Sequence, residues 1–226
     1  MNSEPVAGVS WHVIRKVMAT VPVVASLLAG CGLAGAETAR IPKGFLLTEV
    51  QASATRPPEM TEEDWWKVSD STSRRLELNP CESRRTSRDG RVAMRTITHL
   101  TSGPSYDSEQ LVLYRTAVAA HDAFRELRGE VRSCPGKGSP SSSKVGYFGR
   151  PLRVGDEAMS VGLYFMRDGR RRRDPGRLWA VARRGAAVFL YSSDEVPEDP
   201  ASLVKRLAGQ AGEMAAKVCG LPQVCG

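Results

Sequence analysis

The chain has 226 residues, and its 32 Lys and Arg against 25 Asp and Glu give a formal net charge of +7. This length bounds the protein to one domain, or one domain plus a flexible tether, with enough residues for a sizeable core. The positive charge suits anionic lipid head groups, cell-wall polyanions or nucleic acid, although arginine-rich usage in a GC-rich genome gives the same charge without any binding role.

The N-terminal segment has the pattern of a secretory signal. Arg15 and Lys16 precede an apolar run from Val17 to Leu28, and small residues follow it. Leu28-Ala29-Gly30-Cys31 resembles the bacterial lipobox, which implies a diacylglycerol on the Cys31 sulfur and cleavage just before it. The alternatives are an ordinary signal peptide with a chance cysteine and an uncleaved anchor, but the run is short for a spanning helix. We therefore expect a signal peptide over 1–30 and an extracytoplasmic lipoprotein, a compartment that argues against nucleic acid as a partner.

Four cysteines remain after Cys31, namely Cys81, Cys134, Cys219 and Cys225. An even number in an oxidising compartment indicates two disulfides, and four cysteines allow three pairings. We predict Cys81–Cys134 and Cys219–Cys225, because Gly220 and Pro222 turn the chain back between the second pair. Zinc binding is the alternative, but no pair has the two-to-four-residue spacing of a zinc knuckle, so we expect no metal.

The region before residue 90 has few regular signals. Small, polar and Pro/Gly-punctuated residues over 31–44 predict a tether, and we expect the domain to span 45–226. Thr48 before Glu49 predicts a short helix, and the acidic run 61–64 predicts a second helix start ahead of Trp65 and Trp66. Residues 67–90 are polar and read as irregular.

The next stretch predicts two strands and a helix. Residues 91–100 and 110–114 are typical of strands, with a turn at 102–104. From Thr116 the apolar residues recur at intervals of three and four, which places them on one side of a helix. That helix should end near Cys134, because Pro135 cannot continue it. By composition, residues 135–144 are an exposed loop.

Three strands and a closing helix follow. Residues 161–166, 178–183 and 187–191 predict strands, the last two joined as a hairpin at 184–185. An apolar stripe from Leu203 to Val218 predicts a helix that starts near Pro200. The predicted fold class is α+β, with an antiparallel β-sheet, two main helices packed on one face, and disulfide staples.

The order of these parts is itself informative. A lipobox is followed by Leu46-Leu47-Thr48, Cys81, the strand Glu109–Tyr114, a helix that runs into Cys134, the hairpin 181–188 and a closing helix. This order resembles the PknH-like extracellular sensor domain of actinobacteria over residues 45–219. The resemblance implies a disulfide-stapled antiparallel sheet with helices and a cleft proposed to bind a ligand. It also implies the stand-alone lipoprotein form, because the chain has no kinase phosphate loop or His-Arg-Asp run.

Catalytic signals are weak. Two histidines follow the signal segment, His99 on a strand and His121 beside the apolar side of a helix, and neither has a carboxylate or cysteine at ligand spacing. No Gly-x-Ser-x-Gly elbow occurs. The acidic pairs 156–157 and 194–195 fit solvated turns better than paired acid and base. We expect no enzyme activity, no catalytic residue and no cofactor.

Two short segments are candidate contacts for a ligand or a membrane. Trp65 and Trp66 are adjacent, and on a helix their side chains point about 100° apart, so one packs while the other lines a groove or meets the membrane. Arg170, Arg171, Arg172 and Arg173 form a basic loop tip that could meet anionic lipids. Core packing for the tryptophans and a solvated tip for the arginines are the alternatives.

These observations favour a non-catalytic cell-surface lipoprotein with a sensor or ligand-binding domain. Its expected partners are the membrane, through the lipid anchor, and a small or wall-derived ligand. The alternative is a structural or adaptor lipoprotein that binds another envelope protein, which a large exposed apolar patch without a deep pocket would favour. An envelope enzyme is the third reading, but the sequence offers no convergent set of titratable groups.

Overall fold

The computed structural model describes residues 39–53, 65–82, 89–101, 105–134, 144–167, 170–195 and 199–225, which belong to one compact unit. Cys31, the predicted signal peptide, the turn at 102–104 and most of the predicted loop after Pro135 lie outside the described residues. Within the described residues, no helix is long and apolar enough to cross a membrane.

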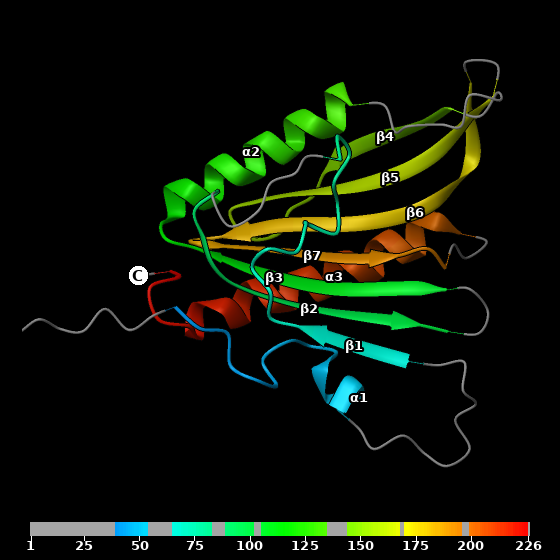
Figure 1. Cartoon of the computed structure of the whole chain (residues 1–226). Helices are drawn as coiled ribbons and strands as arrows, with labels where there is room; N and C mark the ends of the chain where they lie inside the picture. The colour runs from blue at the N-terminus through cyan, green and yellow to red at the C-terminus, as the bar shows by residue number, and fades with distance from the viewer. Residues whose placement is uncertain are drawn as a thin grey trace, which may run out of the picture. The chain divides into compact units, whose positions relative to one another are not determined.

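One antiparallel sheet organises the fold (Figure 1). Its seven strands lie in the order β1-β2-β3-β7-β6-β5-β4. The strands are β1 (Trp65–Ser69), β2 (Arg91–Leu100), β3 (Tyr106–Tyr114), β4 (Lys144–Pro151), β5 (Glu157–Arg167), β6 (Arg170–Arg184) and β7 (Ala187–Ser193). The helices are α1 (Glu49–Ser53), α2 (Ala117–Ser133) and α3 (Pro200–Lys217), followed by the 3-10 turn η1 (Val218–Gly220). The α+β class, the antiparallel sheet, the two main helices and the two disulfides are confirmed.

The sheet consists of two consecutive meanders. Strands β1, β2 and β3 form the first, and β4, β5, β6 and β7 form the second, with each strand hydrogen-bonded to the next in sequence. The two meanders join where β3 pairs with β7, with Glu109 opposite Tyr191 and Leu111 opposite Phe189. Among the strands of this sheet, β3 and β7 are the neighbours that do not follow each other in the sequence.

Both long helices begin where their sequences predict. The side chain of Thr116 caps α2 by accepting a hydrogen bond from the Ala119 amide at 3.1 Å. Asp199 caps α3 by accepting from the Ala201 amide at 3.0 Å, and Pro200 occupies the first turn, where its missing N–H costs nothing. Both helices then follow the predicted apolar stripes.

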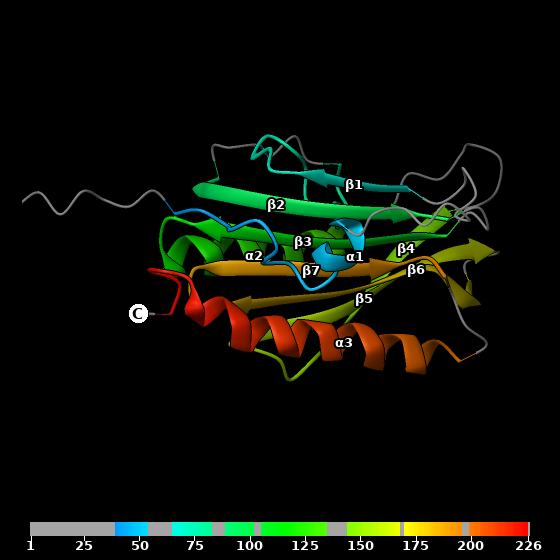
Figure 2. The same cartoon turned by 90° about the horizontal axis from the view of Figure 1, so that it is seen from below.

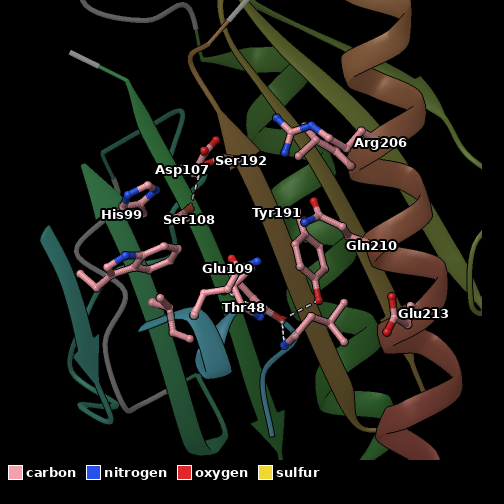
Figure 3. Close-up of a pocket in the computed structure, with 15 residues that line it drawn as sticks. Thr48, His99, Asp107, Ser108, Glu109, Tyr191, Ser192, Arg206, Gln210 and Glu213 are labelled. Atoms are coloured by element: carbon pink, nitrogen blue, oxygen red, sulfur yellow. Dashed lines mark hydrogen bonds between the residues drawn. The ribbon is translucent and has the colours of Figure 1, made fainter. Parts of the chain in front are cut away.

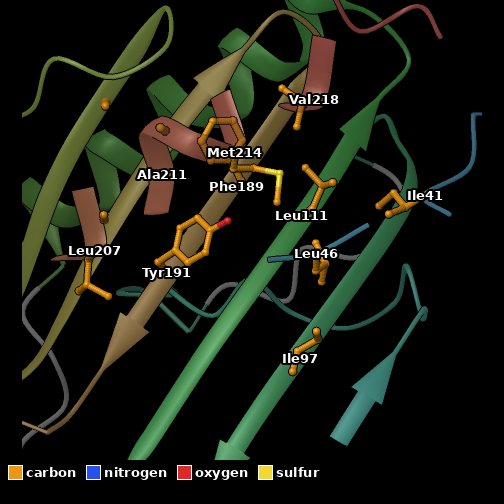
Figure 4. Packing of buried hydrophobic residues seen from close by; sticks show 14 of the residues in the cluster. Ile41, Leu46, Ile97, Leu111, Phe189, Tyr191, Leu207, Ala211, Met214 and Val218 are labelled. Carbon is orange, nitrogen blue, oxygen red and sulfur yellow. The ribbon is translucent and has the colours of Figure 1, made fainter. Parts of the chain in front are cut away.

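The two helices cover opposite faces of the sheet, so the predicted packing on one face is wrong. Phe189 and Tyr191 of β7 point into the core under α3 (Figure 4), whereas Val188 and Leu190 point into the core under α2. Figure 2 shows α3 along one side of the sheet, with α2 behind the strands. All residues of β7 are buried, and a strand covered on both faces has a continuous apolar run rather than an alternating one. Each apolar face of the central strand is therefore covered by one of the two helices.

The predicted helix start before Trp65 and Trp66 is also wrong. Both tryptophans belong to the edge strand β1, where Trp66 lies opposite His99. Successive side chains of a strand point to opposite faces, so the expected separation of the two rings holds for a different reason.

The folded domain begins before the predicted boundary at residue 45. Ile41 is only 7% exposed and packs in the core with Leu46 and Leu221. Burying the apolar side chain of Ile41 is favourable. This residue therefore belongs to the folded domain and not to the predicted tether. The tether prediction for 31–38 lies outside the described residues.

Both predicted disulfides are present, each with a Cα–Cα distance of 5.1 Å. Cys81–Cys134 fastens the segment after β1 to the end of α2. Cys219–Cys225 closes a short C-terminal loop whose Val224 carbonyl accepts a hydrogen bond from the Ala186 amide at 2.8 Å. Gly185 in that same turn has φ +53°, and a Cβ there would lie 1.8 Å from the Val224 oxygen. The C-terminal loop therefore packs directly on the β6–β7 turn, which only glycine permits.

Candidate functional site

A pocket of about 400 Å³ opens on the α3 face of the sheet (Figure 3). Strands β2, β3 and β7 form its floor, α3 forms one wall, and β1 with the start of α1 forms the other. Its lining combines an aromatic pair, three polar side chains of α3 and two carboxylates of β3. These groups differ in how many of their contacts are already made within the protein, and so in how far they are available to a ligand.

Glu109 lies at the base of the pocket and is 2% exposed. Its carboxylate accepts hydrogen bonds from the Leu47 amide at 2.8 Å, the Thr48 amide at 2.8 Å, the Thr48 hydroxyl at 2.7 Å and the Tyr191 hydroxyl at 2.7 Å. A carboxylate has about four lone-pair sites, so these donors occupy the whole group. Glu109 therefore anchors the segment before α1 to the sheet and has no free lone pair with which to take a proton from a substrate.

Tyr191 completes this base. Burial raises the pKa of its hydroxyl well above the ordinary value, and the neighbouring charge of Glu109 raises it further. The phenol consequently stays protonated and donates to Glu109. The pair holds the floor rigid, which suits recognition of a ligand of fixed shape.

Trp66 and His99 form the aromatic wall. Their rings are stacked with centroids 3.9 Å apart and planes 6° from parallel. Both line the pocket, whereas Trp65 is 46% exposed and does not. Of the two predicted tryptophan contacts, the structure thus places Trp66 in the pocket. Each ring covers one face of the other, so an outer face of the stack is the aromatic surface that remains for the apolar face of a ligand.

The opposite wall presents Arg206, Gln210 and Glu213 of α3, which project toward the pocket (Figure 3). Their spacing of four and three residues puts them on one side of the helix. Asp107 faces this wall from β3, and its Oδ1 atom is buried without a hydrogen-bond partner within the described part of the chain. A buried acceptor without a partner is costly, so a donor group of a ligand would be favourable there.

The sequence pointed to Trp66, named His99 only as a weak catalytic signal, and missed the residues of α3. Arg206, Gln210 and Glu213 flank an apolar stripe and look like an ordinary solvated side of a helix. Only the position of α3 over β7 turns them toward the sheet. The signal that could have found them is their common helical side, next to the buried Leu207.

The two histidines do not meet. His99 lies in the pocket on the α3 face, whereas His121 lies on α2, which covers the other face. His121 is 2.7 Å from Glu157, and Glu157 also accepts from Arg183 at 2.8 Å. Burial raises the pKa of Glu157, but these partners outweigh it and hold the pKa below its usual range. The described residues hold no group of three His, Cys, Asp or Glu side chains that could bind a metal ion.

Asp156 and Asp194, the first residue of each acidic pair in the sequence, make structural contacts. Asp156 accepts from the Arg184 side chain and the Gly185 amide, each at 2.8 Å. Asp194 accepts from the Tyr106 amide at 2.5 Å and from Arg177 at 3.1 Å. These carboxylates hold strand ends and turns, and neither lines the pocket.

The predicted basic loop tip is part of a strand. Arg170, Arg171, Arg172 and Arg173 open β6, which pairs with β5. The side chain of Arg173 and residues 168–169 lie outside the described part of the structure. Arg170, Arg171 and Arg172 are exposed, and none of these three lines the pocket under α3.

Comparisons with known proteins give a structural similarity alone. No family model matches the sequence, and no curated protein matches it either. Among solved structures, the extracellular domain of PknH from Mycobacterium tuberculosis aligns with 78% of this chain and 97% of that domain, with a TM-score of 0.49 and 12% identity.

Proposed function

We propose that this protein is a non-catalytic, ligand-binding lipoprotein of the bacterial envelope, held on the extracytoplasmic side of the membrane through Cys31. The pocket under α3 is its binding site. The observation that carries the proposal is the contrast between the fully hydrogen-bonded base of the pocket and its open aromatic and polar walls. Glu109 is saturated by four donors, while the Trp66–His99 stack and the polar wall of α3 line the open space. This arrangement supports recognition of a ligand rather than use of Glu109 as a base.

The lining favours a small polar ligand with an apolar face. A planar indole and imidazole pair accepts the flat face of a sugar ring or a similar group. Arg206, Gln210 and Glu213 offer both donors and acceptors to hydroxyl or amide groups on the opposite side. A saccharide-containing fragment of the cell wall has this combination of groups.

An adaptor that binds another envelope protein is the weaker candidate. The large apolar side chains that are exposed, such as Val50, Val118 and Phe165, are distributed over α1, α2 and β5. Scattered apolar residues are normal on a soluble surface, whereas an adaptor face would gather them in one patch.

The ligand proposal is tested with soluble cell-wall fragments and two matched tryptophan variants. W66A should weaken binding by about 10-fold or more, because an aromatic wall that contacts a ligand contributes about 1.5–3 kcal/mol. W65A removes the neighbouring, exposed ring and should leave the affinity unchanged. Isothermal titration calorimetry gives both dissociation constants, and thermal melting confirms that each variant is folded.

A second change keeps this test independent of folding. Q210A alters a half-buried side chain of α3 that lines the pocket and should also weaken binding. Equal effects of W65A and W66A, or fragments that fail to bind the parent protein, would contradict the proposed site. Mass spectrometry of the fragments after incubation tests the absence of catalysis, since any change that depends on His99 or His121 would identify an enzyme.

Cys31 is tested separately. C31S should leave the precursor unprocessed or release the protein from the membrane fraction, because the thioether that holds the diacylglycerol cannot form. Intact-protein mass and detergent partition measure the change. An unaltered mass and unaltered membrane partition in C31S would rule out lipidation at this residue.

A further inference from the structure

A second concave surface lies at the far edge of the sheet from β1, where the end of α2 lies beside β4 (Figure 1). This β4 groove has a volume of about 680 Å³. Four arginines line it: Arg128 and Arg132 from α2, Arg150 from β4 and Arg171 from β6. No Asp or Glu among the described residues lines it, so the groove is strongly positive.

Three of these four guanidinium groups lack a carboxylate partner among the described residues. Arg128 lies 3.6 Å from Glu157. The other three, Arg132, Arg150 and Arg171, form no ion pair within the part of the chain that the structure describes. Elsewhere in the fold, arginines such as Arg183 are paired with acidic side chains. Unpaired like charges that share one groove repel each other, and an anion between them relieves that repulsion.

Aromatic rings hold one of these arginines in place. The Arg171 guanidinium lies 4.4 Å from the centre of the Tyr164 ring and 5.1 Å from that of Phe148. The two rings meet edge to face, with centroids 5.5 Å apart. A guanidinium stacked on aromatic faces keeps its N–H edge available for a bidentate contact with an oxyanion. Phe148 is 39% exposed, so its ring lies at the surface where Arg171 meets it.

We propose that the β4 groove binds a linear polyanion with phosphate or carboxylate groups in series. Guanidinium groups match both oxyanions in bidentate geometry, and four of them from three elements suit repeated charges rather than a single ion. A concave groove at a sheet edge accommodates one extended chain, whereas a flat membrane surface fits it poorly. The proposal is independent of the pocket under α3, because the two sites share no lining residue.

The test compares variants that remove equal charge. R132Q/R171Q should weaken binding of inorganic polyphosphate about 10-fold or more, because each of the two lost charge-assisted contacts contributes to the free energy of binding. R115Q/R153Q removes two exposed arginines outside the groove and should change the affinity by no more than about twofold. F148A keeps the net charge but removes one support of Arg171, so about a threefold loss is expected. Fluorescence anisotropy at fixed ionic strength measures each dissociation constant, and thermal melting confirms folding.

Three ligands separate the sources of the anion. Tight binding of polyphosphate identifies a phosphate polymer, and tight binding of polyglutamate identifies a carboxylate polymer; either supports the groove when R132Q/R171Q weakens it selectively. The proposal is overturned if R115Q/R153Q causes an equal loss, because binding then reflects total charge. It is also overturned if neither polymer binds, or if only phosphatidylglycerol vesicles do.

Discussion

Replacing both Cys81 and Cys134 with serine should lower the free energy of unfolding by about 4 kcal/mol. The bridge spans 53 residues, and in the chain-entropy model a loop of that length restricts the unfolded chain by about this amount. A typical domain has only about 5–15 kcal/mol of stability, so the variant should be marginal at growth temperature. Urea denaturation of the purified domain measures the difference.

The second disulfide is the matched control. Cys219–Cys225 spans only six residues, for which the same model gives about 2 kcal/mol. C219S/C225S should therefore be the milder variant by about 2 kcal/mol. A larger loss from C219S/C225S would mean that the packing of the C-terminal loop on the β6–β7 turn outweighs loop closure.

Removing the carboxylate of Glu49 should cost about 3–5 kcal/mol of stability. Glu49 is 3% exposed and pairs with Arg95, which is also buried, through two contacts, one of them at 3.0 Å. E49A leaves the buried guanidinium with only an exposed partner, Asp70, and breaking a buried pair from one side carries this penalty. D70A removes that exposed partner of the same arginine and should cost about 0–1 kcal/mol. Equal losses in urea denaturation would show that burial does not decide the strength of these contacts.

The contribution of Glu49 should also depend on pH. Burial raises the pKa of its carboxyl, but the hydrogen bond and charge of Arg95 outweigh burial and hold the pKa below the ordinary value of 4.5. The group is therefore ionised more readily in the folded state than in the unfolded state. Its stabilisation is complete above pH 4.5 and disappears as the pH falls through the lowered pKa. The difference between the parent and E49A should narrow in acid.

Most of the predictions that rest on local signals held, although the helix start predicted ahead of Trp65 did not. Thr116 caps α2 and Pro200 opens α3, because caps and apolar stripes act within one element. The cysteine pairs followed from their number and spacing. Strands β2 and β7 also lie where their apolar and β-branched residues predict them.

The two edge strands were missed for physical reasons. In β1 the tryptophans follow acidic residues that resemble a helix cap, and an edge strand buries too little to show alternation. In β4 the two glycines and Pro151 resemble a loop, yet proline is tolerated at a sheet edge because that position needs no ladder hydrogen bond. The face covered by each helix could not be read locally, because it depends on which strands surround β7.

Neither the pocket nor the groove could be predicted from the sequence, because both depend on residues that are far apart in the chain. The pocket needs α3 to lie beside Trp66, which is about 140 residues earlier in the chain. In the groove, Arg171 is held in place by Tyr164 and Phe148, which lie on neighbouring strands. Long-range pairing converts side chains that look solvated into the lining of a site.

The pairing of β3 with β7 has a consequence for how the chain folds as it is synthesised. The first meander is complete long before β7 emerges, and until then β3 presents an unpaired edge to other chains. Each core cluster draws residues from both meanders, so neither half has a finished interior of its own. We expect closure of this central seam to be the slow step in folding, and the time between emergence of β3 and arrival of β7 to be when the nascent chain most needs a chaperone.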